Sequence, residues 1–286
     1  GLIVMGDGGK DGVDATSGLT LQDMVLDRNY RQGISVISVR GPALRPSALL
    51  FHLLCSAAAC HNSSPILYKP RRSAARAQVV GMRVMNTTLS NTNGTSPAHG
   101  VDFEPDTPNQ RLSDIVFSNC TSIGNQGSGF GFDFAGLTST HWAAGLPPVT
   151  ISFEDCDAIG NHAGWTLTTA YPGLPGSVEV VRGTTSGSLS HGIGIYNKAA
   201  SALGVSFRDH QVWNVSTGGS ACTDVDAAKL CPDGKPVNAP VALFIRDGTP
   251  EKEGGVNLSN LSVADSHDRP WLQVIGDSNG WSDVSL

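Results

Sequence analysis

The sequence is poor in charge and in aromatic residues. Charged residues make up 15% of its 286 residues, and aromatic residues make up 6%. Lysine and arginine number 19 against 25 aspartates and glutamates, which gives a net charge of −6. Proteins that bind nucleic acid need a basic surface, so we expect no nucleic-acid partner. No linker interrupts the sequence pattern, and we expect residues 1–286 to form one elongated domain.

Long apolar runs are also absent. The apolar run at 49–55 (LLFHLLC) is too short to cross a bilayer, so we expect no membrane span. Neither an initiating methionine nor a signal peptide stands at the start of the sequence. Residues 1–4 (GLIV) have the pattern of the last strand of a structural repeat, and we expect the sequence to begin inside one.

An internal repeat runs through most of the chain. The phrases at 115–125 (IVFSNCTSIGN) and 151–161 (ISFEDCDAIGN) share their pattern, and looser copies occur on both sides. The residue four places after the first apolar residue is Asp or Asn in six of the seven copies. These residues are Asp23, Asn86, Asn119, Asp155, Arg182, Asp209 and Asn260. A repeat of this kind decides the architecture before any single motif does.

Each copy predicts two strands that are separated by a glycine. Apolar and polar residues alternate before and after Gly33, Gly100, Gly129, Gly164 and Gly192, which is the pattern of strands with one buried face. No amphipathic helix interrupts them. An Asn at a tight turn tolerates left-handed backbone angles and can donate a hydrogen bond to its equivalent one coil away. These features predict a solenoid.

The chain therefore resembles the right-handed parallel β-helix proteins of the pectin-lyase-like superfamily, over roughly residues 1–38 and 80–286. The resemblance implies an all-β solenoid of about seven coils. A β-sandwich with coincidental repeats is the alternative, but a sandwich would not keep one register over seven copies.

Two segments break the repeat. Gly33 and Gly100 are 67 residues apart, whereas Gly100 and Gly129 are 29 apart, so an irregular or helical insertion is expected near residues 39–79. This insertion contains no acidic residue. It is either an unspliced stretch of a gene model, which we favour, or a basic helix lying on the solenoid or a membrane surface. The second break, at 216–240, is expected to be a loop closed by a disulfide between Cys222 and Cys231.

Cysteines and sequons indicate a secreted or cell-surface glycoprotein. Cys120 and Cys156 occupy the same place in adjacent coils, where they would form a buried thiol stack or a disulfide. Together with Cys222 and Cys231 they suggest an oxidising compartment. Asn-x-Ser/Thr sequons occur at Asn62, Asn86, Asn93, Asn119, Asn214, Asn257 and Asn260.

Alternation predicts which side chains share an outer face. The second, fourth and sixth residues after each glycine should point outward. These positions hold Asp102, Glu104 and Asp106 after Gly100, and Asp133 after Gly129. Adjacent coils are about 4.8 Å apart, so the four carboxylates should form one patch. Tyr196 and Lys198 lie two coils beyond Asp133, and His99 directly precedes Gly100.

The patch suggests chemistry on an acidic polysaccharide. Asp102, Glu104, Asp106 and Asp133 could hold Ca²⁺, which would bridge to a uronate carboxylate. Lys198 or Tyr196 could then remove the proton α to that carboxylate. Here the chain resembles the Ca²⁺-dependent uronate lyases of the superfamily. His99, Asp102 and Asp106 would contact the substrate.

Other readings stay open. Glu104 and Asp133 could instead act as acid and base in glycoside hydrolysis, although the adjacent Asp-Asp of polygalacturonases is absent. The Asp-Pro-His-Asp pattern of alginate epimerases is absent too. The protein could be a non-catalytic glycan-binding or cell-surface module, and the carboxylates could serve only to keep the face solvated. His191 precedes Gly192 as His99 precedes Gly100, so both histidines could be turn residues. The sequence does not define an oligomeric state.

Overall fold

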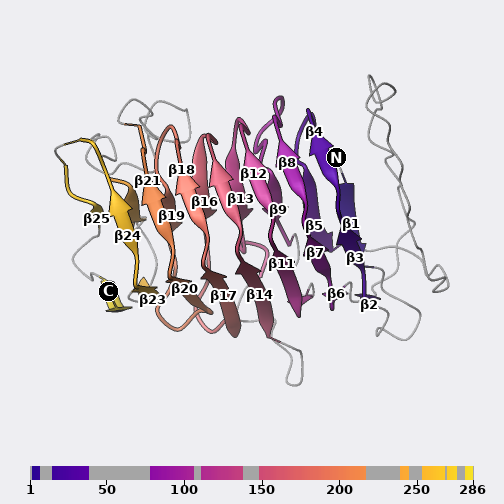
Figure 1. Ribbon diagram of the computed structural model, residues 1–286. Helices are drawn as coiled ribbons and strands as arrows, with labels where there is room; N and C mark the ends of the chain where they lie inside the picture. The colour runs from indigo at the N-terminus through magenta and orange to yellow at the C-terminus, as the bar shows by residue number, and fades with distance from the viewer. Residues whose placement is uncertain are drawn as a thin grey trace.

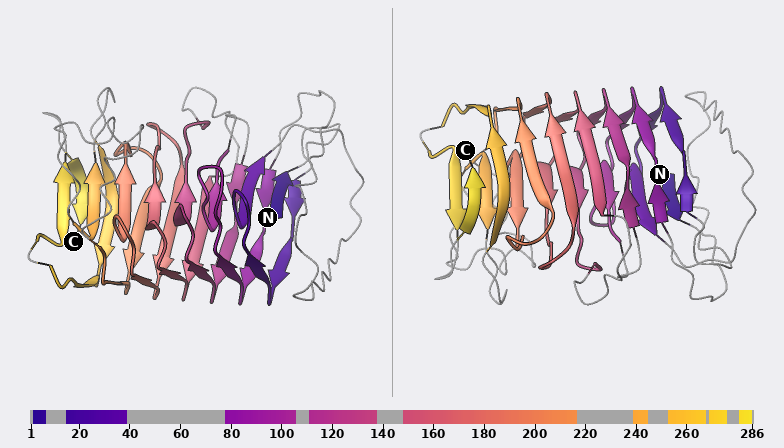
Figure 2. Two further views of the ribbon diagram at one scale, coloured as in Figure 1. Left: turned by 90° about the horizontal axis from the view of Figure 1, so that it is seen from above. Right: turned by 90° about the horizontal axis from the view of Figure 1, so that it is seen from below.

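The computed structural model describes residues 2–6, 15–38, 78–105, 111–137, 148–216, 239–244, 253–267, 269–275 and 281–285. All the regular elements in these residues are β-strands. They form parallel sheets that wind into a right-handed parallel β-helix of about seven coils, as the repeat predicted (Figure 1). Views from above and below show the coils stacked side by side from the N-terminal to the C-terminal end (Figure 2).

Four sheets run along the axis of the β-helix, and we name them A to D. Sheet A contains β1 (Leu2–Gly6), β5 (Ile34–Ser38), β9 (Val101–Phe103), β13 (Ser128–Phe132), β16 (Ala163–Leu167), β19 (Ile193–Tyr196), β22 (Val241–Phe244) and β25 (Leu272–Ile275). Sheet B contains β2 (Ala15–Ser17), β6 (Gln78–Val80) and β10 (Arg111–Ser113).

Sheets C and D follow in the chain before it returns to sheet A. Sheet C contains β3 (Thr20–Gln22), β7 (Arg83–Met85), β11 (Ile115–Ser118), β14 (Val149–Glu154), β17 (Gly176–Val181), β20 (Gly204–Arg208), β23 (Glu253–Ser259) and β26 (Trp281–Ser285). Sheet D contains β4 (Val25–Asp27), β8 (Thr88–Ser90), β12 (Thr121–Ile123), β15 (Asp157–Ile159), β18 (Thr184–Ser186), β21 (Gln211–Trp213) and β24 (Ser262–Ala264).

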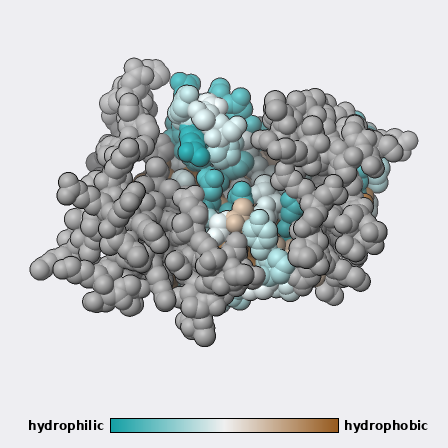
Figure 3. All heavy atoms as spheres, turned by 180° about the vertical axis from the view of Figure 1, so that it is seen from behind, coloured by the Kyte–Doolittle hydropathy of each residue, from teal (hydrophilic) through white to brown (hydrophobic). Residues whose placement is uncertain are grey.

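The core is a stack of inward-facing side chains. Equivalent residues of adjacent coils lie directly over one another, so Phe117 stacks on Phe153 with ring centroids 4.9 Å apart. Phe130 stacks on Trp165 in the same way, at 4.1 Å. The alternation of each strand places these rings inside, and stacking adds to the free energy gained by their burial. The described surface seen from behind is mostly hydrophilic (Figure 3).

A ladder of left-handed residues forms the corner between sheets C and D. Six Asp or Asn residues and Arg182, the seven residues singled out by the repeat, have φ angles between +50° and +54°. Asn119 donates from Nδ2 to Oδ1 of Asn86 at 2.9 Å, and Asn86 donates to Asp23 at the same distance. We name these seven positions the outer ladder. It confirms the prediction that Asp and Asn mark a left-handed turn and bond between coils.

A second ladder is buried at the other end of sheet D. Asn161 Oδ1 accepts hydrogen bonds from both the backbone N–H and the side-chain amide of Asn125, at 2.9 and 2.8 Å. Asn125 Oδ1 in turn accepts from the backbone N–H of Thr92. We name these contacts the inner ladder. Because the amides are buried, each bond satisfies a polar group that water does not reach.

His210 is a buried polar residue inside the coils. Its Nε2 lies 2.9 Å from Thr185 Oγ1, and that oxygen accepts a hydrogen bond from Trp165 Nε1 at 3.0 Å. A hydroxyl that accepts from Trp165 can still donate or accept a second hydrogen bond, so the direction of the contact with Nε2 follows the tautomer of the His210 ring. The buried Nδ1 has no hydrogen-bond partner. Burial lowers the pKa of His210 to about 3, so the ring is neutral at neutral pH.

The structure describes two of the four cysteines for which a pairing was predicted. Cys120 and Cys156 are free and buried, so of the two possibilities the structure has the thiol stack. The hydrogen bond with Cys120, together with burial, raises the pKa of the Cys156 thiol. The loop at 217–238 with Cys222 and Cys231, and the insertion from 39 to 77, lie outside the described residues. Nowhere in the described part of the chain is there a helix that could span a membrane.

Candidate functional site

The predicted carboxylate patch maps to the outer face of sheet A. In β9, Val101 and Phe103 point into the core, so Asp102 between them points outward. Its partners in the adjacent strands are Ser35 and Gly131. This face is therefore made by one residue from each coil, in register.

Asp102 is outward-facing but buried, with 3% of its surface exposed. Gln32 donates from Nε2 to Asp102 Oδ2 at 2.9 Å. Burial raises the pKa of Asp102 to about 7, and the nearby carboxylates of Glu104 and Asp133 act in the same direction. The Gln32 hydrogen bond and the charge of Arg31 oppose this rise. The carboxyl group therefore titrates near neutral pH, about three units above its ordinary range.

Glu104 and Asp133 are the more exposed carboxylates of the group. The guanidinium of Arg31 lies 3.8 Å from Glu104, and both side chains are substantially exposed. Asp133 accepts a hydrogen bond from the backbone N–H of Ala135 at 2.9 Å, which holds its carboxylate at the end of β13. The structure thus brings Asp102, Glu104 and Asp133 close enough to interact electrostatically. Asp106 lies outside the described residues.

These three carboxyl groups do not by themselves make a calcium site. Among the described residues, no group of three or more His, Cys, Asp or Glu is placed to hold a metal ion. A carboxyl that keeps its proton near neutral pH is also a poor ligand for a hard cation. A calcium site at this face would need Asp106, and Ca²⁺ stays a prediction.

His99 lies flat in a notch left by a glycine. A Cβ atom on Gly131 would lie 2.4 Å from Cδ2 and 2.6 Å from Nε2 of the His99 ring, so only glycine fits there. The backbone N–H of Ser128 donates to His99 Nδ1 at 2.7 Å, which leaves the ring proton on Nε2. Burial lowers the pKa of His99 to about 4. The ring is a neutral hydrogen-bond donor beside the carboxyl groups.

His191 and Tyr196 form a similar arrangement two coils away. The His191 ring occupies the notch over Gly194, and its Nε2 lies 2.9 Å from the Tyr196 hydroxyl. Burial lowers the pKa of His191 to about 3 and raises the pKa of Tyr196 well above its usual value. Tyr196 is therefore a neutral phenol. It is paired with His191 and lies two coils, roughly 10 Å, from Asp133.

Lys198 lies at the corner where the chain leaves sheet A. Its side chain is fully buried, and Nζ donates to the carbonyl oxygen of Ala199 at 3.1 Å. Nζ also lies 2.7 Å from the point where a Cβ on Gly255 would be. The structure thus sets both predicted bases, Lys198 and Tyr196, into packed surroundings, two coils from Asp133 and three coils from Asp102 and Glu104.

Sequence reasoning named His99 as a substrate contact but missed that the residue before a glycine can cover the outer face of the next coil. Gln32, His99 and Ser128 directly precede Gly33, Gly100 and Gly129, and each reaches the outer face of the next coil. Gln32 bonds Asp102, His99 covers Gly131, and Ser128 Oγ lies 2.7 Å from Thr166 Oγ1. The shared position of His99 and His191 was the available signal that these residues do more than form a turn. His99 covers Gly131 of the next coil, whereas His191 covers Gly194 of its own coil.

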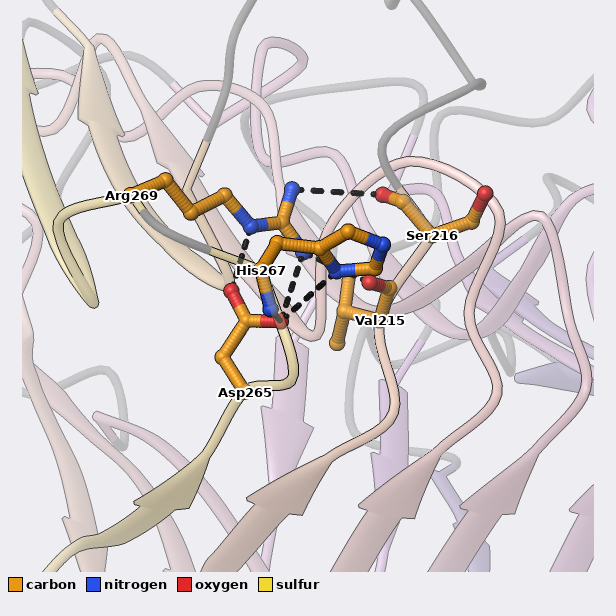
Figure 4. A network of polar contacts seen from close by, with 5 residues as sticks. All are labelled: Val215, Ser216, Asp265, His267 and Arg269. Atoms are coloured by element: carbon orange, nitrogen blue, oxygen red, sulfur yellow. Dashed lines mark hydrogen bonds and ion pairs between the residues drawn. The ribbon is translucent and has the colours of Figure 1, made fainter.

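A separate polar cluster joins two segments that follow strands of sheet D (Figure 4). Asp265 pairs with Arg269 and accepts from His267 at 3.0 Å. Arg269 donates to the carbonyl oxygens of Val215 and Ser216, at 2.6 and 3.3 Å. The Arg269 hydrogen bond, aided by His267, lowers the pKa of Asp265 to about 2. The cluster ties the end of the β21 segment to the next coil, and we assign it a structural role.

Comparison with protein-family models, with curated proteins and with solved structures gave no match. The fold and the candidate site therefore rest on the repeat and on the geometry described above.

Proposed function

We propose that this protein is a secreted or cell-surface carbohydrate-active β-helix protein, and that it cleaves an acidic polysaccharide as a uronate lyase. The observation that carries the proposal is the Asp102 carboxyl group, with a pKa of about 7, beside Glu104, Asp133 and Arg31 on one outer face. Strongly shifted carboxyl groups of this kind concentrate at functional sites. The resemblance of the repeat to the pectin-lyase-like superfamily supports a carbohydrate as the substrate.

Lyase chemistry requires that a proton leave the carbon next to a uronate carboxylate. Arg31 is exposed beside Glu104. Its guanidinium can pair with the uronate carboxylate of the substrate, which stabilises the negative charge that develops as the proton leaves. Asp102 keeps a proton near neutral pH, so the cluster is less negative when a polyanion approaches. Glu104 and Asp133 stand on adjacent coils. One can accept the proton, and the other, when protonated, can supply one to the leaving oxygen.

In this proposal Tyr196 and Lys198 do not act as the base. At neutral pH Tyr196 is a phenol bonded to His191, and the Lys198 side chain is fully buried. The burial of both residues also favours a second candidate function, that of a glycan-binding module without catalysis. Such a module would use the same face and the same charges but release no product.

The two functions are separated by a product assay and a binding assay. The protein is incubated with pectate, alginate and other polyuronates, with Ca²⁺ or with a chelator, and the ultraviolet absorbance of the unsaturated product is followed. We expect product from the wild type. We expect at least a 100-fold lower rate from Glu104→Gln and Asp133→Asn, the usual size of a general acid–base contribution. Glu154→Gln, at the exposed end of β14 in sheet C, is the matched control and should retain full activity.

Each other outcome has a defined meaning. Binding without product on any polyuronate would assign the glycan-binding module in place of the lyase. Neither binding nor product would reject both functions. Product that appears only with Ca²⁺ would require a metal site that includes residues beyond Asp102, Glu104 and Asp133.

A further inference from the structure

The outer face of sheet C contains a groove that the proposed lyase site does not use. It has a volume of about 360 Å³ and crosses four consecutive strands, β17, β20, β23 and β26. The apolar residues of these strands, such as Val205 and Val256, belong to the core. The groove therefore lies on the outward side of a well-packed sheet.

Gly204 leaves the groove hollow, and a second glycine, Gly255, stands beside it. Gly204 stands beside Ser177 in the adjacent strand, and the pairing of Val205 with Val256 sets Gly255 beside Gly204. A Cβ on Gly204 would meet no atom within 4 Å, so the space above this residue is open. Gly255 has a φ of +66°, and a Cβ there would lie 2.7 Å from Lys198 Nζ. The floor of the groove is bare backbone, and Lys198 packs beside it.

The polar lining is in register along the axis. Glu179 pairs with Ser206, Ser206 with Asn257, and Asn257 with Ser285. Consecutive members are therefore separated by one strand spacing, about 4.8 Å. This repeat is close to the length of one sugar unit in an extended glycan. Hydroxyl and amide groups both donate and accept hydrogen bonds, which suits a ligand that carries many hydroxyl groups.

The charge of the groove distinguishes it from the face of sheet A. Among the described residues that line it, Glu179 is the one with a charged side chain, and it would repel a polyuronate. Lys198 packs beside the floor but is fully buried and does not line the groove. An uncharged glycan meets no such repulsion. We propose that the groove on sheet C binds a neutral saccharide chain, laid along the axis across the four strands, as a second site separate from the lyase face.

Filling the groove tests this site without disturbing the fold. Leucine in Gly204→Leu would project into open space and occupy the groove. The matched control is Ser118→Leu, which adds the same side chain to an outward position of β11 in sheet C, outside the groove. The probes are neutral hexasaccharides of β-1,4-glucose, β-1,4-xylose, β-1,3-glucose and β-1,4-mannose, titrated by calorimetry.

We expect at least one neutral hexasaccharide to bind the wild type and Ser118→Leu equally, and to bind Gly204→Leu at least tenfold more weakly. Both variants should melt at the same temperature, and Gly204→Leu should bind oligogalacturonate like the wild type. The proposal is overturned if no neutral hexasaccharide binds the wild type, or if Gly204→Leu and Ser118→Leu bind it equally. Lyase activity is not part of this readout, so the two proposals can fail separately.

Discussion

The ladders that flank sheet D and the outer face of sheet A are built from the same coils but follow different rules. In the outer ladder, equivalent residues share one backbone conformation and most bond their neighbour one coil away. On the face, one column holds Ser35, Asp102, Gly131, Thr166 and Gly194. The corner demands a left-handed residue and so selects its type. The outer face of sheet A requires only that a side chain point outward. The burial and hydrogen bonding of that side chain depend on the residue that covers it.

Low pH should give the largest difference between the two regions. Acid protonates the histidines of the face and the core, whereas the amides of the ladders do not titrate. The folded pKa values of His99, His191 and His210 are lowered to about 4, 3 and 3 from 6.5. The unfolded chain therefore binds more protons than the folded one, and the stability that is present above about pH 6.5 is lost as pH falls through these values. Asp102 acts in the opposite direction with one proton.

The net uptake is about two protons on unfolding, at about 1.4 kcal/mol per proton and pH unit. We expect the free energy of unfolding to fall by on the order of 5 kcal/mol between about pH 6.5 and pH 4. Urea unfolding followed by tryptophan fluorescence at several pH values measures it. A flat profile over this range would show that the three histidines are not held neutral in the folded protein.

The sequence predicted the fold and the outer ladder well, because both come from backbone rules repeated in every coil. The repeat identified all seven outer-ladder positions, six of them Asp or Asn, and Arg182 has the same left-handed φ as the others. The sequence also identified Asp102 as outward-facing by alternation. It did not indicate that Gln32, 70 residues earlier, bonds that carboxyl group, since this contact depends on how adjacent coils are offset. The burial of Tyr196 and Lys198 was missed because alternation predicts which way a side chain points but not whether other residues cover it.

Asp102→Asn should show how much the buried charge on the face destabilises the fold, because it removes a carboxyl group that is unfavourable to ionise. The folded pKa is raised from 3.8 to about 7, so the stability that this group contributes is fully present below about pH 4 and is lost as pH rises through 7. Asparagine resembles the protonated carboxyl group and can still accept from Gln32. We expect the variant to be more stable than the wild type at pH 8, by up to about 4 kcal/mol, and by less than half of that at pH 5.

The measurement is urea unfolding of both proteins at pH 5 and pH 8. Asp133→Asn is the control, because its carboxylate is partly exposed and its replacement should change stability less. The same difference between Asp102→Asn and the wild type at both pH values would contradict a buried carboxyl group that titrates near neutrality.

Asn161→Ala should show how much the inner ladder contributes. The change removes the acceptor of two Asn125 hydrogen bonds and the donor to the carbonyl of Ser122. It leaves buried polar groups without partners, so we expect a loss of about 3 kcal/mol in the free energy of unfolding. Urea unfolding at pH 7 measures this loss. A loss below about 1 kcal/mol would mean that water replaces the missing amide.

The outer ladder should give the smallest effect, and it allows conformation and hydrogen bonding to be separated. Asn119 has a φ of +50° and donates one exposed hydrogen bond to Asn86. Asn119→Gly removes the bond and keeps the left-handed conformation accessible, so we expect a loss of a few tenths of a kcal/mol. Asn119→Ala removes the same bond and adds left-handed strain of about 1 kcal/mol. If alanine and glycine prove equal in urea unfolding, the amide bond and not the backbone conformation selects Asn at the corner. If alanine costs about 1 kcal/mol more, the conformation selects it, which explains why Arg182 can take the same place in a neighbouring coil.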